Sequence, residues 1–212
     1  MNEKMMQRRT VNAAAIAVIA FAALIAVPSF AQEAPDAMVK RVSAETVQAI
    51  KGDPKLAAGD PARVREAIEQ KLLPNFDFTR MTALAMGRNW KQATPEQQEK
   101  LTNEFRTLLV RTYSNALTQY RDETIDVKPL RGDANATEVT VRSEVVRAGR
   151  PPVQIDYGMT KTPQGWKAYD VVVGGVSLVT TYRDEFNEQI KAGGVDGLLK
   201  TLAAKNSGAA GK

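Results

Sequence analysis

The longest regular hydrophobic pattern in the chain predicts a helix over Thr94–Arg121. Thr94, Pro95 and Gln97 give a start signal, with a capping threonine, a proline at the first helical position and a capping-box glutamine. At 1.5 Å per residue the helix is about 40 Å long, so its apolar face needs a large apolar partner. The apolar side chains recur every three or four residues and share one stripe: Leu101, Phe105, Leu108, Leu109, Tyr113, Ala116, Leu117 and Tyr120.

Shorter helices are predicted on both sides of this long one, each with its own apolar stripe. Gly and Pro separate them, and Lys51–Pro61, with two of each, is predicted as a loop. Gly87 suits the C-terminal cap of the third helix. The five helices cover Ala37–Ile50, Ala62–Leu73, Phe76–Met86, a segment that Ser177 caps and Gly193–Gly194 ends, and Val195–Ala204.

After residue 123 the pattern changes to the two-residue alternation of strands. Short turns rich in Gly, Pro, Asn and Asp separate the alternating runs, which favours an antiparallel meander. The expected fold class is α+β, with a twisted four-stranded antiparallel sheet wrapped by about six helices. The four predicted strands cover Thr124–Leu130, Thr137–Arg147, Val153–Met159 and Trp166–Val173.

The first 31 residues have the three parts of a secretory signal peptide. Lys4, Arg8 and Arg9 precede an apolar run over Ala13–Val27, and small residues lead to a cleavage position after Ala31. The alternative is an uncleaved anchor, but the run has only about 15 residues where a span needs about 20. The expected organisation is a cleaved peptide over 1–31, a single domain over 32–206 and a disordered tail over 207–212.

Composition excludes several kinds of chemistry. The chain has no Cys and no His, so it lacks a disulfide, a thiol nucleophile, an imidazole base and a His-ligated or Cys-ligated metal site. Removal of the leader lowers the net charge from +5 to +3. This charge is too small and too dispersed to indicate a nucleic-acid partner, and no metal or other cofactor is expected.

Two strand carboxylates are the candidates for acid–base chemistry. Asp156 and Asp170 lie inside predicted strands, and a buried carboxylate in a sheet-and-helix cup is able to act as a general base. A strand-edge ion pair is the more ordinary explanation for both. A small-molecule isomerase or hydrolase therefore remains the enzymatic alternative.

Several longer segments of the chain match one known protein family. The most specific is GWKAYDVVVGGVSLVTTYRDEF followed by GGVDGLLKTL; the others are LLPNFDFTRMTALAMGRNWKQATPEQQ, EFRTLLVRTYSNAL and RPPVQIDYGM. Together they cover most of the mature chain. In sequence and in order they resemble the MlaC family of periplasmic phospholipid-binding, toluene-tolerance proteins.

The resemblance implies a periplasmic, monomeric carrier with phospholipid as its cargo. It would hold acyl chains in an apolar cavity and carry them between an outer-membrane lipoprotein complex and an inner-membrane MCE-type ABC transporter, which maintains outer-membrane lipid asymmetry. Arg88 and Arg150 are the rim candidates for the headgroup or a partner. The residues that the resemblance places at the cavity are Leu84, Phe105, Leu109, Tyr113, Val141, Ile155, Tyr157, Val171 and Val176. A periplasmic chaperone or adaptor with a solid core is the third alternative.

Overall fold

The computed structural model describes residues 32–117, 123–132, 135–147 and 149–208. All of these belong to one compact unit, Gln32–Lys212. The predicted signal peptide over 1–31 lies outside the described residues, as do residues 209–212 of the predicted tail. Among the described helices, none combines the length and the apolar character that a membrane span requires.

The helices follow the predicted order with altered ends. The first and the last of the described elements are helices, and short 3-10 and π segments join some of the elements between them. The α-helices are α1 (Pro35–Gly52), α2 (Pro54–Ala57), α3 (Pro61–Ala67), α4 (Phe78–Met86), α5 (Pro95–Leu117) and α6 (Leu178–Asn206). The π segment η1 (Ile68–Leu72) and the 3-10 segment η2 (Leu73–Asn75) lie between α3 and α4, and the 3-10 segment η3 (Gly87–Gln92) follows α4.

The sheet is an antiparallel meander, which confirms the predicted α+β class. Its strand order is the chain order, and every pair of neighbours is antiparallel. The strands are β1 (Thr124–Val127), β2 (Glu138–Val146), β3 (Val153–Thr162), β4 (Gly165–Val173) and β5 (Val176–Ser177). The sequence predicted four strands; β5, at two residues, is too short for an alternation to reveal it.

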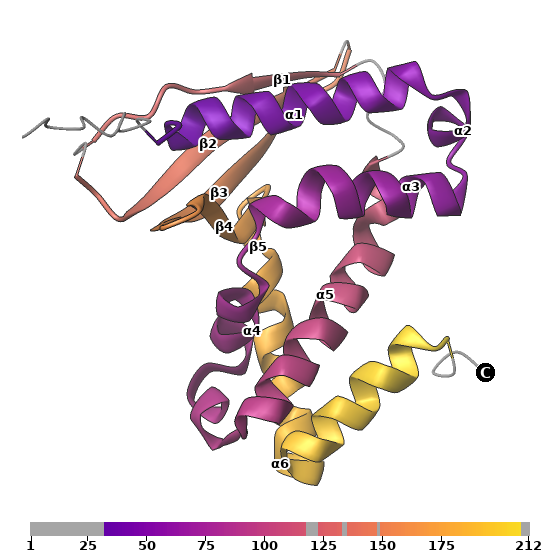
Figure 1. Ribbon diagram of the computed structural model, residues 1–212, viewed down its shortest axis with the longest axis vertical. Helices are drawn as coiled ribbons and strands as arrows, with labels where there is room; N and C mark the ends of the chain where they lie inside the picture. The colour runs from indigo at the N-terminus through magenta and orange to yellow at the C-terminus, as the bar shows by residue number, and fades with distance from the viewer. Residues whose placement is uncertain (1–31, 118–122, 133–134, 148, 209–212) are drawn as a thin grey trace, which may run out of the picture. The chain divides into compact units, whose positions relative to one another are not determined.

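The helices contact the sheet in two ways: α1 lies along it, whereas α4, α5 and α6 form a separate cluster that touches it at β4 (Figure 1). The helix α1 runs along the sheet and packs against β1 and β2. The helices α4, α5 and α6 pack on one another, and α4 and α6 also contact β4. The long predicted helix therefore has α4 and α6 as its main partners, and α1 is the helix that covers the sheet.

The predicted caps are present. The Thr94 amide donates to Gln97 Oε1 at 2.9 Å, and the Gln97 amide donates to Thr94 Oγ1 at 3.3 Å, which completes the capping box at the start of α5. Gly87 follows α4 at a φ of 56°, and the Ser177 hydroxyl accepts from the Thr180 amide at 3.0 Å to cap α6. The predicted loop after α1 contains the one-turn helix α2, because Asp53 caps it.

Candidate functional site

An apolar cavity of about 150 Å³ lies between α1 and the sheet. Its floor is one face of β1, β2, β3 and β4, and its roof is the apolar stripe of α1; the segment around η1 and η2 forms a side wall. None of the described lining residues is charged. They are Met38, Val39, Val42, Ser43, Thr46, Val47, Ile50, Leu72, Asn75, Phe76, Ile125, Val145, Ile155, Tyr157, Met159 and Ala168.

Strand alternation and register bring the floor residues onto one face. Residues paired across antiparallel strands point to the same side of a sheet, and Ile125 pairs with Val145, while Met159 pairs with Ala168. Between these rows Ile155 and Tyr157 follow the two-residue period along β3. Met159 continues this period, and a register shift after Gly158, at which β4 has the extra residue Tyr169, brings Ala168 onto this face opposite Met159.

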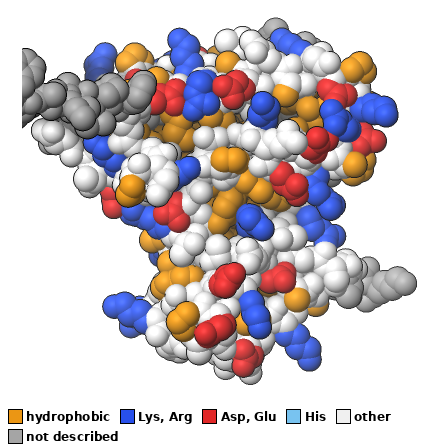
Figure 2. All heavy atoms as spheres, viewed as in Figure 1, with side chains coloured by type: hydrophobic (Ala, Val, Ile, Leu, Met, Phe, Trp, Pro, Cys, Tyr) orange, Lys and Arg blue, Asp and Glu red, His pale blue; other side chains and the backbone are white. Residues whose placement is uncertain are grey.

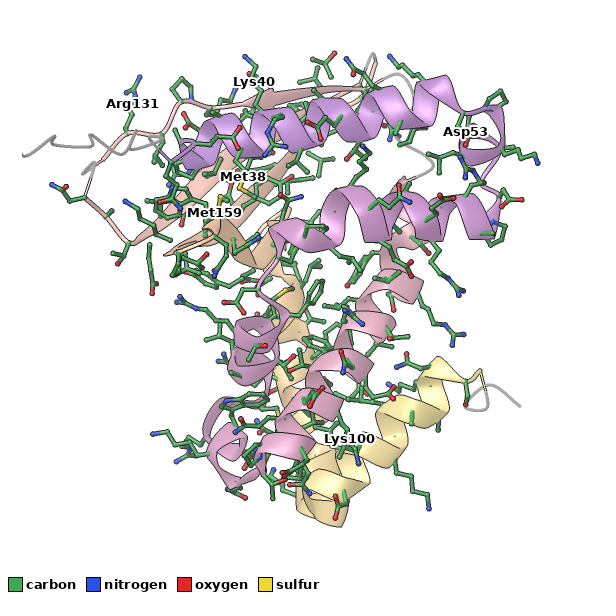
Figure 3. The ribbon with its side chains drawn as sticks, in the orientation of Figure 1. Met38, Lys40, Asp53, Lys100, Arg131 and Met159 are labelled. Carbon is green, nitrogen blue, oxygen red and sulfur yellow. The ribbon has the colours of Figure 1, made fainter. Side chains whose placement is uncertain are left out.

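One end of the cavity is closed by buried side chains. Met38, Met159 and Trp166 belong to one cluster and are each less than 9% exposed. Figure 3 shows Met38 of α1 and Met159 of β3 meeting between the helix and the sheet, whereas Lys40 points away from the sheet.

The opposite end of the cavity face carries exposed apolar side chains. Val153 pairs with Val145, and Val176 pairs with Val173, so both lie on the cavity face; they are 42% and 59% exposed. Figure 2 shows hydrophobic side chains at the surface between α1 and the helices beneath it. The apolar surface of the cavity therefore continues to solvent.

Two of the nine predicted site residues line this cavity, and three more share its sheet face. Ile155 and Tyr157 are in the lining. Val141 and Val171 flank Tyr157 in one cross-strand row, and Val176 lies at the exposed end of the face. The register thus brings five of the nine residues onto a single surface.

The other four predicted residues belong to the helical core instead. Leu84, Phe105, Leu109 and Tyr113 pack in the cluster that α4, α5 and α6 form. The Phe105 ring is fully buried, and its centroid lies 5.1 Å from the Phe186 centroid in an edge-to-face arrangement. Contact of these four residues with a lipid stays a prediction, since they are absent from the described cavity lining.

The two predicted rim arginines lie at different places. Arg150 is in the turn between β2 and β3, next to the open end of the cavity face, where its amide donates to the Arg147 carbonyl. Arg88 is in η3 and borders a surface cleft between α4 and α6. Only Arg150 is therefore near the cavity.

The two strand carboxylates lie outside the cavity. Asp156 is on the opposite face of the sheet, beside Arg142 of β2. Asp170 accepts hydrogen bonds from the Ser177 hydroxyl at 2.7 Å and from the Val179 amide at 3.3 Å, and thereby ties β4 to the start of α6. Its role in this structure is a cap, and the expected ion pair is replaced by these bonds.

A protein-family model matches most of this chain. The model of the MlaC protein family matches residues 40–204. The chain belongs to the MlaC family. The match begins within α1 and ends within α6, and it covers the floor of the cavity and all of the roof except Met38 and Val39.

Individual MlaC relatives agree with this assignment. The toluene tolerance protein ttg2D of Pseudomonas putida is 25% identical over 81% of this chain and 80% of that protein. The intermembrane phospholipid transport system binding protein MlaC of Haemophilus influenzae is 22% identical over 84% of this chain and 85% of its own. A phospholipid-binding protein from Ralstonia solanacearum, solved in complex with a phospholipid, is 44% identical and covers 82% of this chain and 98% of its own, with a TM-score of 0.77.

Sequence reasoning missed the contribution of α1 to the site of this MlaC-family chain. The signal was present, because Met38, Val42, Val47 and Ile50 form an apolar stripe, and all four line the cavity. The pattern shows that α1 has a buried face but does not say which surface that face covers. The resemblance instead placed Phe105, Leu109 and Tyr113 of the longer α5 stripe at the cavity.

Proposed function

We propose that this protein is a periplasmic phospholipid carrier that holds acyl chains between α1 and the sheet. The observation that supports the proposal most strongly is the cavity, which has no charged residue in its described lining and is open at one end. The Ralstonia solanacearum protein that is 44% identical to this chain was solved in complex with a phospholipid. A diacyl lipid exposes about 30 methylenes, and at about 0.8 kcal/mol each its tails cost roughly 24 kcal/mol in water. An apolar interior removes most of that cost.

The cavity must enlarge when a lipid enters. A volume of about 150 Å³ holds a ligand of roughly benzene size, which is a short part of one acyl chain. Because α1 forms the roof and lies at the N-terminal end of the domain, we propose that it separates from the sheet during loading. The apolar stripe of α1 then exchanges contacts with the sheet for contacts with lipid.

The carrier would exchange lipid between an outer-membrane lipoprotein complex and an inner-membrane MCE-type ABC transporter. The names of the Haemophilus influenzae and Pseudomonas putida relatives, which refer to intermembrane phospholipid transport and toluene tolerance, support this role. Loading and unloading between two apolar environments are nearly isoenergetic, so the partners must supply the direction. The predicted signal peptide would deliver the chain to the periplasm.

The alternatives fit the cavity less well. The described lining contains no Asp or Glu, so it offers no carboxylate base for an isomerase or hydrolase. A chaperone or adaptor with a solid core is disfavoured by the cavity itself. We therefore propose binding and transfer of lipid, without catalysis, as the function.

A matched pair of variants tests the cavity as the site for the tails. Ile155→Glu puts a carboxylate in the lining, and Val146→Glu makes the same kind of change on the opposite face of the sheet. After incubation with phosphatidylethanolamine–phosphatidylglycerol vesicles, we expect the first variant to retain at least about tenfold less lipid than wild type, because desolvating a charge costs several kcal/mol. The control retains the wild-type amount, and circular dichroism verifies that both variants are folded. Equal retention by the two variants would contradict the proposed site.

A further inference from the structure

An ion pair lies just beyond the cavity lining, where β1 begins and β2 ends. Thr124 pairs with Val146, so the preceding residue of the chain, Glu123, lies opposite Arg147. The Arg147 side chain donates from Nε to Glu123 Oε1, and its Nη2 forms an ion pair with the same oxygen. This contact shows that the two side chains are on the same side of the sheet.

The pair is on the cavity side. Ile125 and Val145 are two residues away from Glu123 and Arg147 along their strands, and both line the cavity. Two residues of a strand span about 7 Å. The exposed Val153 pairs with Val145 at the same end of the face, so the ion pair lies where the apolar surface meets solvent.

Glu123 has an unsatisfied oxygen. Its side chain is 3% exposed, yet Oε2 has no hydrogen-bond partner. Buried polar atoms are nearly always paired, and an unpaired charged oxygen is destabilising. This oxygen is therefore able to accept one more hydrogen bond once a donor reaches it, and a positively charged N–H group is the donor that suits it.

Arg147 has donors to spare. A guanidinium carries five N–H groups, and the contacts with Glu123 use only those on Nε and Nη2. Its side chain is 37% exposed, and no other ion pair of Arg147 occurs within the described part of the chain. The remaining donors are suited to a phosphate oxygen.

We propose that Glu123 and Arg147 form a headgroup site that selects phospholipids with a primary ammonium group, such as phosphatidylethanolamine. The phosphate binds the free guanidinium donors of Arg147, and the ammonium donates to Glu123 Oε2. The inference rests on the proposed function, because tails in the cavity place the headgroup at its open end. A choline headgroup has no N–H to donate, and the glycerol headgroup of phosphatidylglycerol brings no cation to the carboxylate.

Wild-type protein alone gives the first test. It is incubated with vesicles that contain equal amounts of phosphatidylethanolamine, phosphatidylcholine and phosphatidylglycerol, then separated from them, and its bound lipids are extracted and measured by mass spectrometry. We expect an excess of phosphatidylethanolamine over each competitor of about tenfold, as a hydrogen bond to a charged group gives. Equal binding of the three lipids would overturn the headgroup site while the carrier function stands.

A matched pair of variants assigns the preference to Glu123. Glu123→Gln keeps the shape of the side chain and an oxygen for Arg147, but replaces the acceptor Oε2 with a donor. Glu144→Gln makes the same change on the opposite face of β2. We expect the phosphatidylethanolamine content of the first variant to fall to that of its competitors, and the second variant to keep the wild-type excess.

The outcomes separate the two proposals. A preference that survives Glu123→Gln overturns the headgroup site. Absence of any bound lipid on folded wild-type protein overturns the carrier function and, with it, the headgroup site. If Glu123→Gln does not fold, the comparison of phosphatidylethanolamine with phosphatidylcholine on the wild type decides the matter.

Discussion

At the scale of single residues, the same apolar character serves two different purposes. Phe105 and Leu109 are buried in the helical core, and Phe105 meets the rings of Tyr182 and Phe186. Ile155 and Val47 are only partly buried and face a cavity. Sequence cannot distinguish the two groups, because a side chain that faces a packed core and one that faces a cavity are equally apolar.

Removing volume at Leu109 should therefore affect stability and leave lipid binding intact. Leu109 is 6% exposed in the core cluster, and we expect Leu109→Ala to lower the free energy of unfolding by about 2–5 kcal/mol. Val47→Ala, in the cavity lining, should cost less than about 1 kcal/mol. Urea denaturation measures both. Loss of bound lipid from folded Leu109→Ala protein would instead support the predicted contact of Leu109 with a lipid.

We expect the protein to lose stability at alkaline pH because of two tyrosines that pack against the helical core. Burial raises the pKa of Tyr113 and Tyr169 above the ordinary value of 10, with smaller contributions from Tyr182 and Glu138, respectively. The folded state then holds these protons more tightly than the unfolded state. Their contribution to stability is complete below pH 10 and is lost as the pH rises through the raised pKa values.

Urea denaturation between pH 8 and 11.5 measures this effect. We expect the midpoint to fall more steeply above pH 10 in the wild type than in the double variant Tyr113→Phe, Tyr169→Phe, which has no phenol to ionise at these positions. Identical slopes for the two proteins would show that the tyrosines are not responsible.

At the scale of elements, the hydrophobic periodicity predicted which helices and strands exist, but not which of them pack against one another. The strands and the main helices are where the hydrophobic pattern places them, because an amphipathic face needs burial whatever its partner is. The packing of α5 against α6 depends on the fit of Phe105 against Phe186 and Tyr182. The hydrophobic pattern of a sequence does not show which side chains fit together in this way. The roof of the cavity was therefore not predictable from the pattern, although five of the nine predicted site residues are on its sheet face.

The break in α6 was predictable, because it depends on a single backbone conformation. Gly194 has φ 66° and ψ −168°, a region that is essentially restricted to glycine. It joins the two helices that the sequence predicted, and the second packs Leu198 and Leu202 into the core.

Adjacent glycines provide a controlled test of this break. Gly194→Ala should lower the free energy of unfolding by about 1–3 kcal/mol, because alanine is strained in this conformation. Gly193 has a helical conformation, and a Cβ there meets no atom within 4 Å, so Gly193→Ala should raise stability by about 0.5–1 kcal/mol. Thermal unfolding followed by circular dichroism measures both. Equal effects at the two positions would contradict a special conformation at Gly194.

At the scale of the whole molecule, the proposed function gives the helical core and the cavity separate roles. Phe105, Phe186 and Leu202 are fully buried in the cluster of α4, α5 and α6, so this cluster would keep the domain folded while α1 and the sheet separate. The volume of the cavity in this state matches only part of one acyl chain. A bound lipid should therefore stabilise the protein, because it binds the folded state and not the unfolded chain.

The most direct test of the account is native mass spectrometry of mature protein purified without detergent or denaturant. We predict a main species heavier than the polypeptide by the mass of one phospholipid, and loss of that species in Ile155→Glu but not in Val146→Glu. A spectrum of freshly purified, folded wild-type protein with only the mass of the polypeptide would contradict the carrier function.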